Sequence, residues 1–115
     1  MPRFLAVYTM RPENLARFRA LPTAEQEAVD VAGVQRWTNW ERANGASLRD
    51  GGMVGKTRRV TKDGVADARN DICGYVAVEA ENIEAAANLF INHPHFTIFP
   101  GDGVDIMPLV TGPQD

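Results

Sequence analysis

The part of the chain that decides the fold runs from Lys62 to Pro108 and reads KDGVADARNDICGYVAVEAENIEAAANLFINHPHFTIFPGDGVDIMP. Its Asp63-Gly64 pair is typical of a turn, and the alternating apolar run Ile72–Val78 predicts a strand. Apolar side chains at helical spacing predict a helix over Ile83–Asn92. A last strand is expected at Val104–Pro108. Turn, strand, helix, loop and strand in this order form half of a split β-α-β fold.

The residues before this stretch supply the other half. Phe4–Tyr8 is a continuous apolar run, which predicts a central strand buried on both faces. A long helix is expected over Thr23–Asn44, with the Thr23 side chain as its N-cap. A turn at Asp50-Gly51-Gly52 and a strand at Met53–Thr61 are expected to follow. The order β, α, β, β, α, β predicts one α+β domain over residues 1–115, a ferredoxin-like four-stranded antiparallel sheet with two helices on one face.

The composition excludes several classes of protein. The 115 residues carry a net charge of −3, and no strongly basic segment is present, so we expect no nucleic-acid or anionic-membrane partner. Cys73 is the single cysteine, which rules out an internal disulfide and a cysteine-based metal cluster. No run approaches 18 apolar residues, and no phosphate loop or dinucleotide fingerprint is present. We therefore expect a cytoplasmic protein without a cofactor.

The predicted sheet has one face that the two helices leave open. On the strand that begins at Ile72, both sets of alternating side chains are poorly polar, so this open face is apolar whichever set it carries. A large exposed apolar face needs a partner. We expect a homodimer formed through the open sheet face, with twofold symmetry.

Two histidines are the sharpest candidates for chemistry. His93 and His95 are expected in a loop after the second helix, where one of them would serve as a general acid or base. Asp63 is the carboxylate we select as a catalytic partner, with Asp102 and Asp105 as alternatives. The other interpretation of the histidines is structural: capping, with a helix C-terminus stabilising a cation, or a dimer contact. Two histidines are too few ligands for a metal site, so we expect none.

Three further residues are candidates for holding a small-molecule ligand. Tyr8 and Trp37 would line a pocket beside the histidines, and Arg58 would clamp a carboxylate or phosphate. Each has a structural alternative: the rings as core or dimer anchors, and Arg58 as part of a solvated strand.

The chain resembles the YCII-related proteins, including their DGPF branch. The resemblance covers most of the chain after about Val31, and its motifs are short. The matching residues are Phe4–Tyr8, Gly45, Asp50-Gly51-Gly52, Asp63-Gly64-Val65-Ala66-Asp67, Ile72-Cys73-Gly74-Tyr75, Ile83–Ile91, Pro94 and Val104–Leu109.

The resemblance implies a dimeric α/β barrel with a pocket between helices and sheet. It also implies a His–Asp pair as active site, but those positions fall on Val34 and His93 here, and the family's basic residue near the end falls on Met107. Two functions therefore stay open: a small-molecule enzyme that uses a loop histidine as acid or base, and a non-catalytic module for ligand binding or dimerisation.

Overall fold

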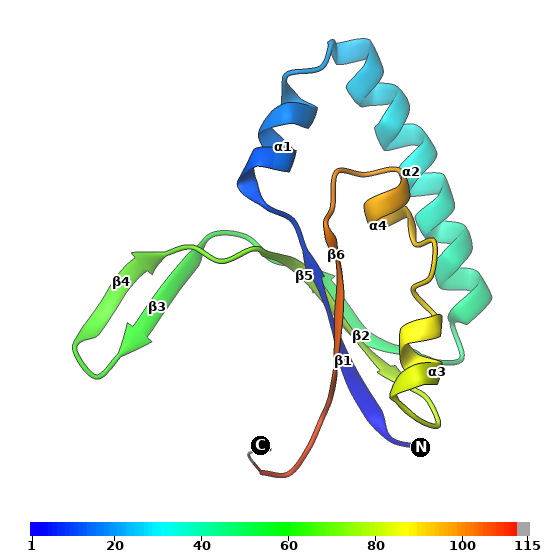
Figure 1. Ribbon diagram of the computed structural model, residues 1–115, viewed down its shortest axis with the longest axis vertical. Helices are drawn as coiled ribbons and strands as arrows, with labels where there is room; N and C mark the ends of the chain where they lie inside the picture. Colours follow the sequence, from blue (N-terminus) through cyan, green and yellow to red (C-terminus); the bar gives the residue numbers. More distant parts are fainter. Residues whose placement is uncertain (113–115) are drawn as a thin grey trace.

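The computed structural model describes residues 1–112. Four strands form one antiparallel sheet in the order β2-β5-β1-β6, and two more form a separate ribbon, β3-β4. The helices cover one face of the sheet, and the ribbon leaves on the opposite side (Figure 1). The elements are β1 (Arg3–Thr9), α1 (Pro12–Arg19), α2 (Thr23–Asn44), β2 (Leu48–Met53), β3 (Thr57–Thr61), β4 (Gly64–Ala68), β5 (Ile72–Glu79), α3 (Ile83–Asn88), α4 (Pro94–Thr97) and β6 (Gly103–Pro108).

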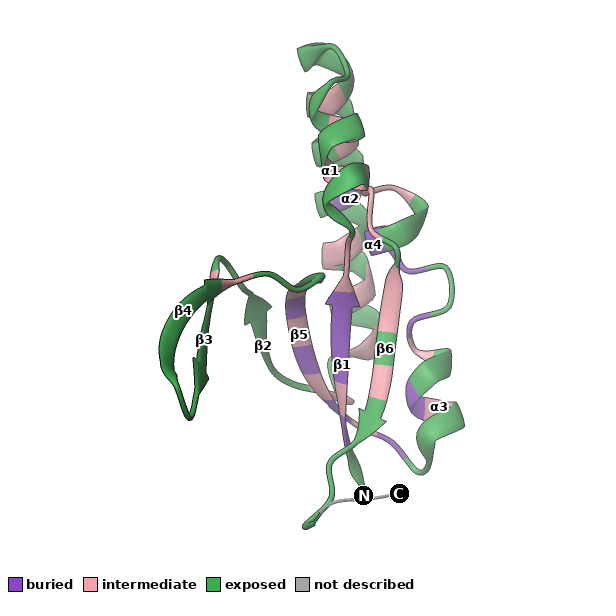
Figure 2. Cartoon of the chain, turned by 60° about the vertical axis from the view of Figure 1, so that its left-hand side comes forward, coloured by how far each residue is buried: buried purple, intermediate pink, exposed green. Residues whose placement is uncertain are grey.

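The predicted α+β class and the four-stranded antiparallel sheet are confirmed. Strand β1 lies between β5 and β6, which explains why the run Phe4–Tyr8 is apolar at every position. On the side of the sheet that the helices cover, Phe4, Ala6 and Tyr8 of β1 pair with three residues of β5, namely Val78, Val76 and Gly74. The burial pattern in Figure 2 places the core along these two strands and under α3 and the residues that follow it. The core residues are Phe4, Ala6, Tyr8, Val76, Val78, Ala80, Ala86 and Phe90.

The strand predicted at Met53–Thr61 is correct only in its second half, which is β3 (Thr57–Thr61), and this strand belongs to the ribbon and not to the four-stranded sheet. The sheet strand is β2, which ends where that prediction begins and includes the Asp50-Gly51-Gly52 segment expected to be a turn. Leu48 packs against the core and anchors β2. The later residues Thr57–Thr61 place Arg, Val and Thr on alternating positions and offer no continuous apolar face to bury. They form the ribbon instead.

The helices also differ from the sequence prediction. The short helix α1 lies where one or two helical turns were expected between Pro12 and Pro22, and α4 is a further short helix after the second predicted one. Thr23 does not cap α2: the N-cap position is Pro22, without a side-chain hydrogen bond. The second predicted helix ends early, at Asn88, and Asn92 adopts a left-handed backbone with φ 59° before His93 starts α4. These breaks turn His93 and His95 inward.

Two adjacent glycines in β2 provide a matched test of this strand. A Cβ on Gly51 would lie 2.7 Å from the carbonyl oxygen of Tyr75 and 3.1 Å from Cα of Val76, whereas a Cβ on Gly52 would meet nothing within 4 Å. Because the atoms facing Gly51 belong to backbone, Gly51→Ala should lower the free energy of unfolding by about 1–3 kcal/mol. Gly52→Ala should leave it unchanged or raise it by about 0.4–1 kcal/mol. Urea unfolding of both variants measures this, and equal effects would contradict the register of β2 against β5.

Candidate functional site

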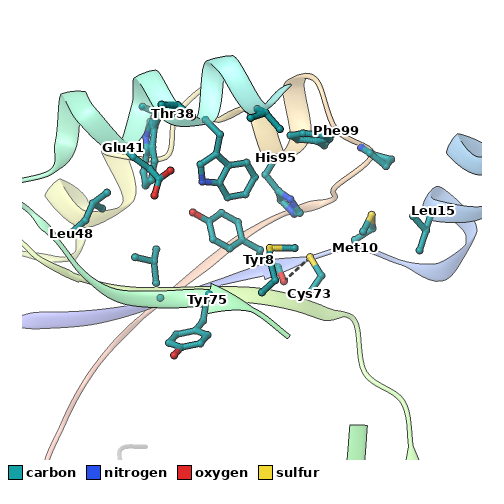
Figure 3. Close-up of a pocket in the computed structure, with 18 of the residues that line it drawn as sticks. Tyr8, Met10, Leu15, Thr38, Glu41, Leu48, Cys73, Tyr75, His95 and Phe99 are labelled. Atoms are coloured by element: carbon teal, nitrogen blue, oxygen red, sulfur yellow. Dashed lines mark hydrogen bonds between the residues drawn. The ribbon is translucent and has the colours of Figure 1, made fainter. Parts of the chain in front are cut away.

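A cavity of about 580 Å³ lies between α2 and the sheet (Figure 3). Its floor is formed by β1, β2 and β5, and its roof by α2 and the loop after α4. Most of the lining is apolar or aromatic. The walls include Tyr8, Trp37, Glu41, Met53, Cys73, His95 and Phe99. A concave, mostly apolar space with a few polar groups is the usual form of a small-molecule site.

The cavity exists because aromatic rings hold α2 away from the sheet. Gly33 is the only residue of α2 that is buried, and the ring of Phe99 occupies the space that a Cβ at Gly33 would need. Trp37 reaches down from α2, with its ring centroid 5.0 Å from that of Tyr8 and 6.1 Å from that of Phe99. These rings pack against the middle of α2, and the cavity lies beside them.

His93 is enclosed by aromatic side chains and has no exposed surface. The ring centroids of Trp37 and Trp40 lie 4.5 and 4.4 Å from its own, and Phe90 stacks at 5.7 Å. Burial, with a smaller effect from the charge of His95, lowers the pKa of His93 to about 4. His93 is therefore neutral at physiological pH. The expectation that a helix C-terminus stabilises a histidine cation is wrong for this residue, which caps the N-terminus of α4.

The hydrogen bonds of His93 define which of its nitrogens carries the proton. Its Nδ1 accepts the backbone N–H of His95 at 2.9 Å, so in the neutral ring the proton lies on Nε2. Nε2 is 3.3 Å from the hydroxyl oxygen of Tyr8 and donates to it. Tyr8 already accepts this bond, so its own proton is free to be donated elsewhere. Because burial, helped by the charge of Glu41, raises the pKa of Tyr8, the phenol stays protonated and acts as a donor.

At the cavity wall, His95 provides a hydrogen-bond acceptor, whereas Tyr8 provides a donor. Its Nε2 lies 2.8 Å from the carbonyl oxygen of Thr9, which can only accept, so Nε2 carries the proton and Nδ1 is left as an acceptor. Burial is the main cause that lowers the pKa of His95, and Thr9 and Asp102 oppose it. No side-chain nitrogen or oxygen that is buried in residues 1–112 lacks a partner. Since Nδ1 has no hydrogen bond to this part of the chain, it keeps some accessible surface, and His95 is one of the residues that line the cavity.

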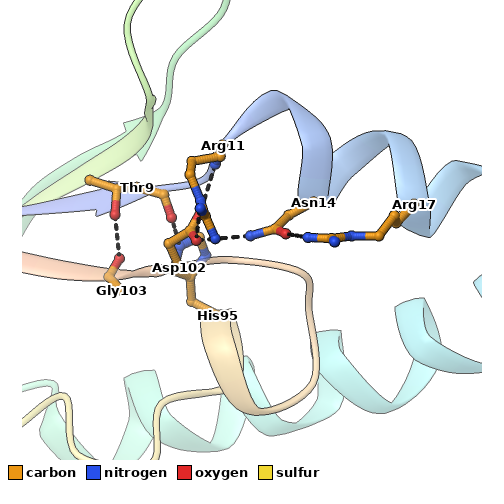
Figure 4. A network of polar contacts seen from close by, with 7 residues as sticks. All are labelled: Thr9, Arg11, Asn14, Arg17, His95, Asp102 and Gly103. Atoms are coloured by element: carbon orange, nitrogen blue, oxygen red, sulfur yellow. Dashed lines mark hydrogen bonds and ion pairs between the residues drawn. The ribbon is translucent and has the colours of Figure 1, made fainter.

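A polar network outside the cavity holds His95 in this orientation (Figure 4). The Thr9 carbonyl also accepts the backbone N–H of Asp102 at 2.9 Å. The Asp102 carboxylate accepts bonds from the backbone N–H and Nε of Arg11 and from Asn14 at 2.6, 2.9 and 2.8 Å. These bonds hold the pKa of Asp102 below its usual value. Gly101 packs so closely on the His95 ring that a Cβ there would overlap it.

The remaining polar groups of the wall are few. Glu41 lies on α2 with its carboxylate directed toward the Tyr8 hydroxyl (Figure 3), and no cation within residues 1–112 pairs with it. The Arg49 guanidinium is committed to Glu79 and to the carbonyls of Ala46 and Leu48. Cys73 donates from Sγ to the Tyr8 carbonyl at 3.4 Å, and burial raises the pKa of its thiol. The wall therefore carries one carboxylate, Glu41, without an ion-pair partner, and one guanidinium, Arg49, that is already paired with Glu79.

The structure brings together four of the six residues selected from the sequence. Tyr8, Trp37 and His95 line the cavity, and His93 lies directly behind them. Asp63 and Arg58 lie elsewhere, on the exposed β3-β4 ribbon, where they contact Lys62 and Asp67. The carboxylate near His95 is Asp102, one of the alternatives.

Sequence reasoning missed Glu41 and the helix face that carries it. Val34, Trp37, Thr38 and Glu41 all line the cavity and recur at the i, i+3, i+4, i+7 spacing of one helical face. From the sequence, the apolar stripe of this helix is expected to run through Val29, Gly33, Trp37, Trp40 and Asn44, a set that includes Trp37 but leaves out Glu41. The signal was present, but an acidic residue beside two tryptophans looks like the polar edge of an ordinary amphipathic helix.

Two kinds of site are not found among residues 1–112. No three His, Cys, Asp or Glu side chains converge there to hold a metal ion. No helix in the same range is long and apolar enough to cross a membrane.

The buried state of His93 predicts a pH dependence of stability. Its pKa is lower in the folded chain, about 4, than the ordinary 6.5, so the unfolded chain binds more protons between these values and stability falls as pH falls. The intact protein should lose about 2 kcal/mol of unfolding free energy from this residue between pH 7.5 and pH 5. Urea titrations of the intact chain and of His93→Gln measure it. The variant should be less stable at pH 7.5 but lose less stability on acidification than the intact chain; an equal loss in the two proteins would contradict the assignment.

Comparisons with known proteins extend the fold assignment. No family model matches the chain, and no curated protein matches it by sequence. Among solved structures, it is similar to 5-chloro-2-hydroxyhydroquinone dehydrochlorinase from Burkholderia phenoliruptrix AC1100, determined in complex with 2,5-dihydroxybenzoquinone. The TM-score is 0.58 at 14% identity, and the match covers 96% of this chain and 95% of the other. The similarity therefore spans the whole fold.

Proposed function

We propose that this protein is a small-molecule enzyme of the YCII-like dimeric-barrel type, acting on a neutral hydroxylated aromatic compound in the cavity. The observation that carries the proposal is the direction of the hydrogen bonds. A single buried chain, from the His95 backbone through His93 to Tyr8, leaves a donor on Tyr8, and the Thr9 carbonyl leaves an acceptor on His95. Both groups belong to the wall of the same cavity.

His95 is the proposed base and Tyr8 the proposed electrophilic donor. His95 is neutral because burial lowers its pKa, and its orientation is fixed through Nε2, as a catalytic imidazole requires. A ligand proton moves to Nδ1, and the negative charge that develops on a ligand oxygen accepts the Tyr8 hydroxyl hydrogen bond. Nδ1 then returns the proton to a ring carbon of the same ligand, so the net step is a keto–enol tautomerisation that changes no oxidation state.

The charge of the wall favours a neutral ligand. Glu41 stands without a cationic partner in the described chain, and Arg49 is already engaged, so a carboxylate ligand would meet repulsion and find no clamp. A phenolic hydroxyl accepts from Tyr8 and donates to His95 or Glu41, and its ring packs against Trp37 and Phe99. The complex of the structural neighbour with 2,5-dihydroxybenzoquinone supports a hydroxylated six-membered ring as the ligand.

A non-catalytic binding module is the second candidate. It is favoured by the residues at the positions of the family's His–Asp pair, where Val34 is apolar and His93 is sealed from the cavity. On this interpretation Tyr8 and His95 recognise the ligand without moving a proton.

The protein is also proposed to form a homodimer through the open face of the sheet. Leu5, Val7, Tyr75 and Ala77 lie on this face, which the helices leave uncovered (Figure 2); Val7 is buried among its neighbours, and the other three are half-buried. The chain exposes 7964 Å², whereas a compact monomer of its 12.6 kDa exposes about 6,200 Å². The excess of roughly 1,800 Å² is more than the ~800 Å² that one partner buries in a standard interface.

Ligand-binding measurements on two tyrosine variants test the proposed site in the cavity. Calorimetry should detect binding of hydroquinone, catechol or benzene-1,2,4-triol, and benzoate should bind at least about tenfold more weakly because of Glu41. Tyr8→Phe should weaken the phenols by about 5- to 10-fold, the worth of one hydrogen bond. Tyr75→Phe is the matched control, since the Tyr75 ring points to the other side of the sheet (Figure 3). An equal effect of both substitutions would remove Tyr8 from the site.

Proton transfer is tested separately from binding. In D₂O, exchange of ring hydrogens of bound benzene-1,2,4-triol can be followed by proton NMR. The intact protein should accelerate this exchange, and His95→Gln should reduce the acceleration by about 10²-fold or more while ligand affinity changes little. Binding without any accelerated exchange by the intact protein would instead support the non-catalytic module.

A further inference from the structure

The β3-β4 ribbon projects away from the body of the fold (Figures 1 and 2). Every residue from Arg58 to Asp67 is exposed. Val60 and Val65 face each other across the ribbon yet remain 75% and 59% exposed. An isolated two-stranded hairpin is marginally stable in water. A ribbon with this regular strand pairing is therefore expected to pack against another surface.

The ribbon leaves the sheet toward the open face. Helices lie on one side of the sheet in Figure 1 and the ribbon on the other. A body that covers the open face would therefore sit beside the ribbon. The radius of gyration, 15.9 Å, exceeds the ~13 Å of a compact domain of this length, as expected for a chain with projecting parts.

Charge distinguishes the ribbon, taken together with its flanking residues Lys56, Arg69 and Asn70, from the rest of the molecule. Residues 56–70 contain five basic and two acidic side chains, a net charge of +3. Because the whole chain carries −3, the remaining residues carry −6. The ribbon of one copy is therefore attracted to the body of another.

The charges that remain unpaired lie on both surfaces. Arg58 pairs with Asp67 and Lys62 with Asp63, which leaves Lys56, Arg59 and Arg69 without an acidic partner in residues 1–112. The acids that border the open face are Asp50, beside the Tyr75 hydroxyl, and Asp105, opposite Val7 on β6. Neither has an ion-pair partner within the described chain.

We propose that the β3-β4 ribbon is an arm that clasps a second copy of this chain seated on the open sheet face. Lys56, Arg59 and Arg69 of the arm lie against the acidic border of that copy, which includes Asp50 and Asp105. The arrangement is reciprocal, since twofold symmetry gives each copy one arm and one acidic border. This inference rests on the homodimer proposed above and adds the element that holds it.

Sedimentation velocity over a range of protein concentrations tests the arm. Arg59→Glu/Arg69→Glu should raise the dimer dissociation constant at least about tenfold at 0.15 M salt, and replacing residues 56–70 by a short Gly-Ser linker should raise it at least as much. The matched control is Arg36→Glu/Arg42→Glu, the same charge change on exposed positions of α2. It should leave the dissociation constant within about threefold. The difference between the two charge variants should shrink at 1 M salt, because the Debye length there is about 3 Å and attraction between exposed charges is screened beyond that distance.

The outcomes separate the arm from the dimer itself. A dimer that both arm variants leave as tight as the intact chain retains the proposed dimer and overturns the arm. An intact chain that stays monomeric at 100 µM overturns both. Circular dichroism of the double-glutamate variant controls for folding, because its substitutions are at exposed positions and remove no buried contact.

Discussion

The burial of an uncharged histidine is the constraint on which this structure depends. His93 has no exposed surface and sits among Trp37, Trp40, Phe90 and Tyr8. A neutral imidazole has one donor and one acceptor, and a buried group of this kind loses about 1–3 kcal/mol for each partner it lacks. Both partners are supplied, by the His95 backbone and by Tyr8. A protonated ring would have two donors and no use for the His95 N–H, so the packing and the protonation state support each other.

This constraint also decides what the cavity can do. Exchanging donor and acceptor on His93 would reverse the Tyr8 hydroxyl and turn a donor at the cavity wall into an acceptor. The wall that results has one neutral donor, one imidazole acceptor and one carboxylate, and the donor and the acceptor are held in place by His93 and by the Thr9 carbonyl. Groups fixed in this way need little reorganisation when charge develops on a ligand, which is the main source of electrostatic catalysis. The aromatic lining adds binding affinity but does little to orient the ligand.

The sheet and the long helix followed from the sequence because their signals are local. Strands β1, β5 and β6 carry apolar runs or alternation, and α2 begins and ends as its pattern predicts. Strand β2 was missed because its formation depends on contact with β5. Its Gly-Gly pair is typical of a turn in the sequence, but in the structure Gly51 lets β2 approach the Tyr75 carbonyl closely. The site was found only in part for the same reason. Tyr8, Trp37 and His95 stand out by residue type, whereas the distance of Asp63 from the histidines depends on a ribbon that leaves the sheet.

The proposed arm and the cavity are not independent parts of the molecule. The ribbon is attached to the sheet at two points, just after Met53 at the end of β2 and just before Cys73 near the start of β5, and both residues line the cavity. The Val54 backbone N–H, hydrogen-bonded to the Cys73 carbonyl at 3.2 Å, ties the two attachment points together. An arm clasped on a second copy would restrict these points, and a ligand packed against Met53 and Cys73 would restrict them as well. Because each event orders the same short segment, each reduces the entropy cost of the other, and this coupling is reciprocal by linkage. The stretch that departs furthest from the predicted fold is therefore the one through which partner and ligand would act on each other.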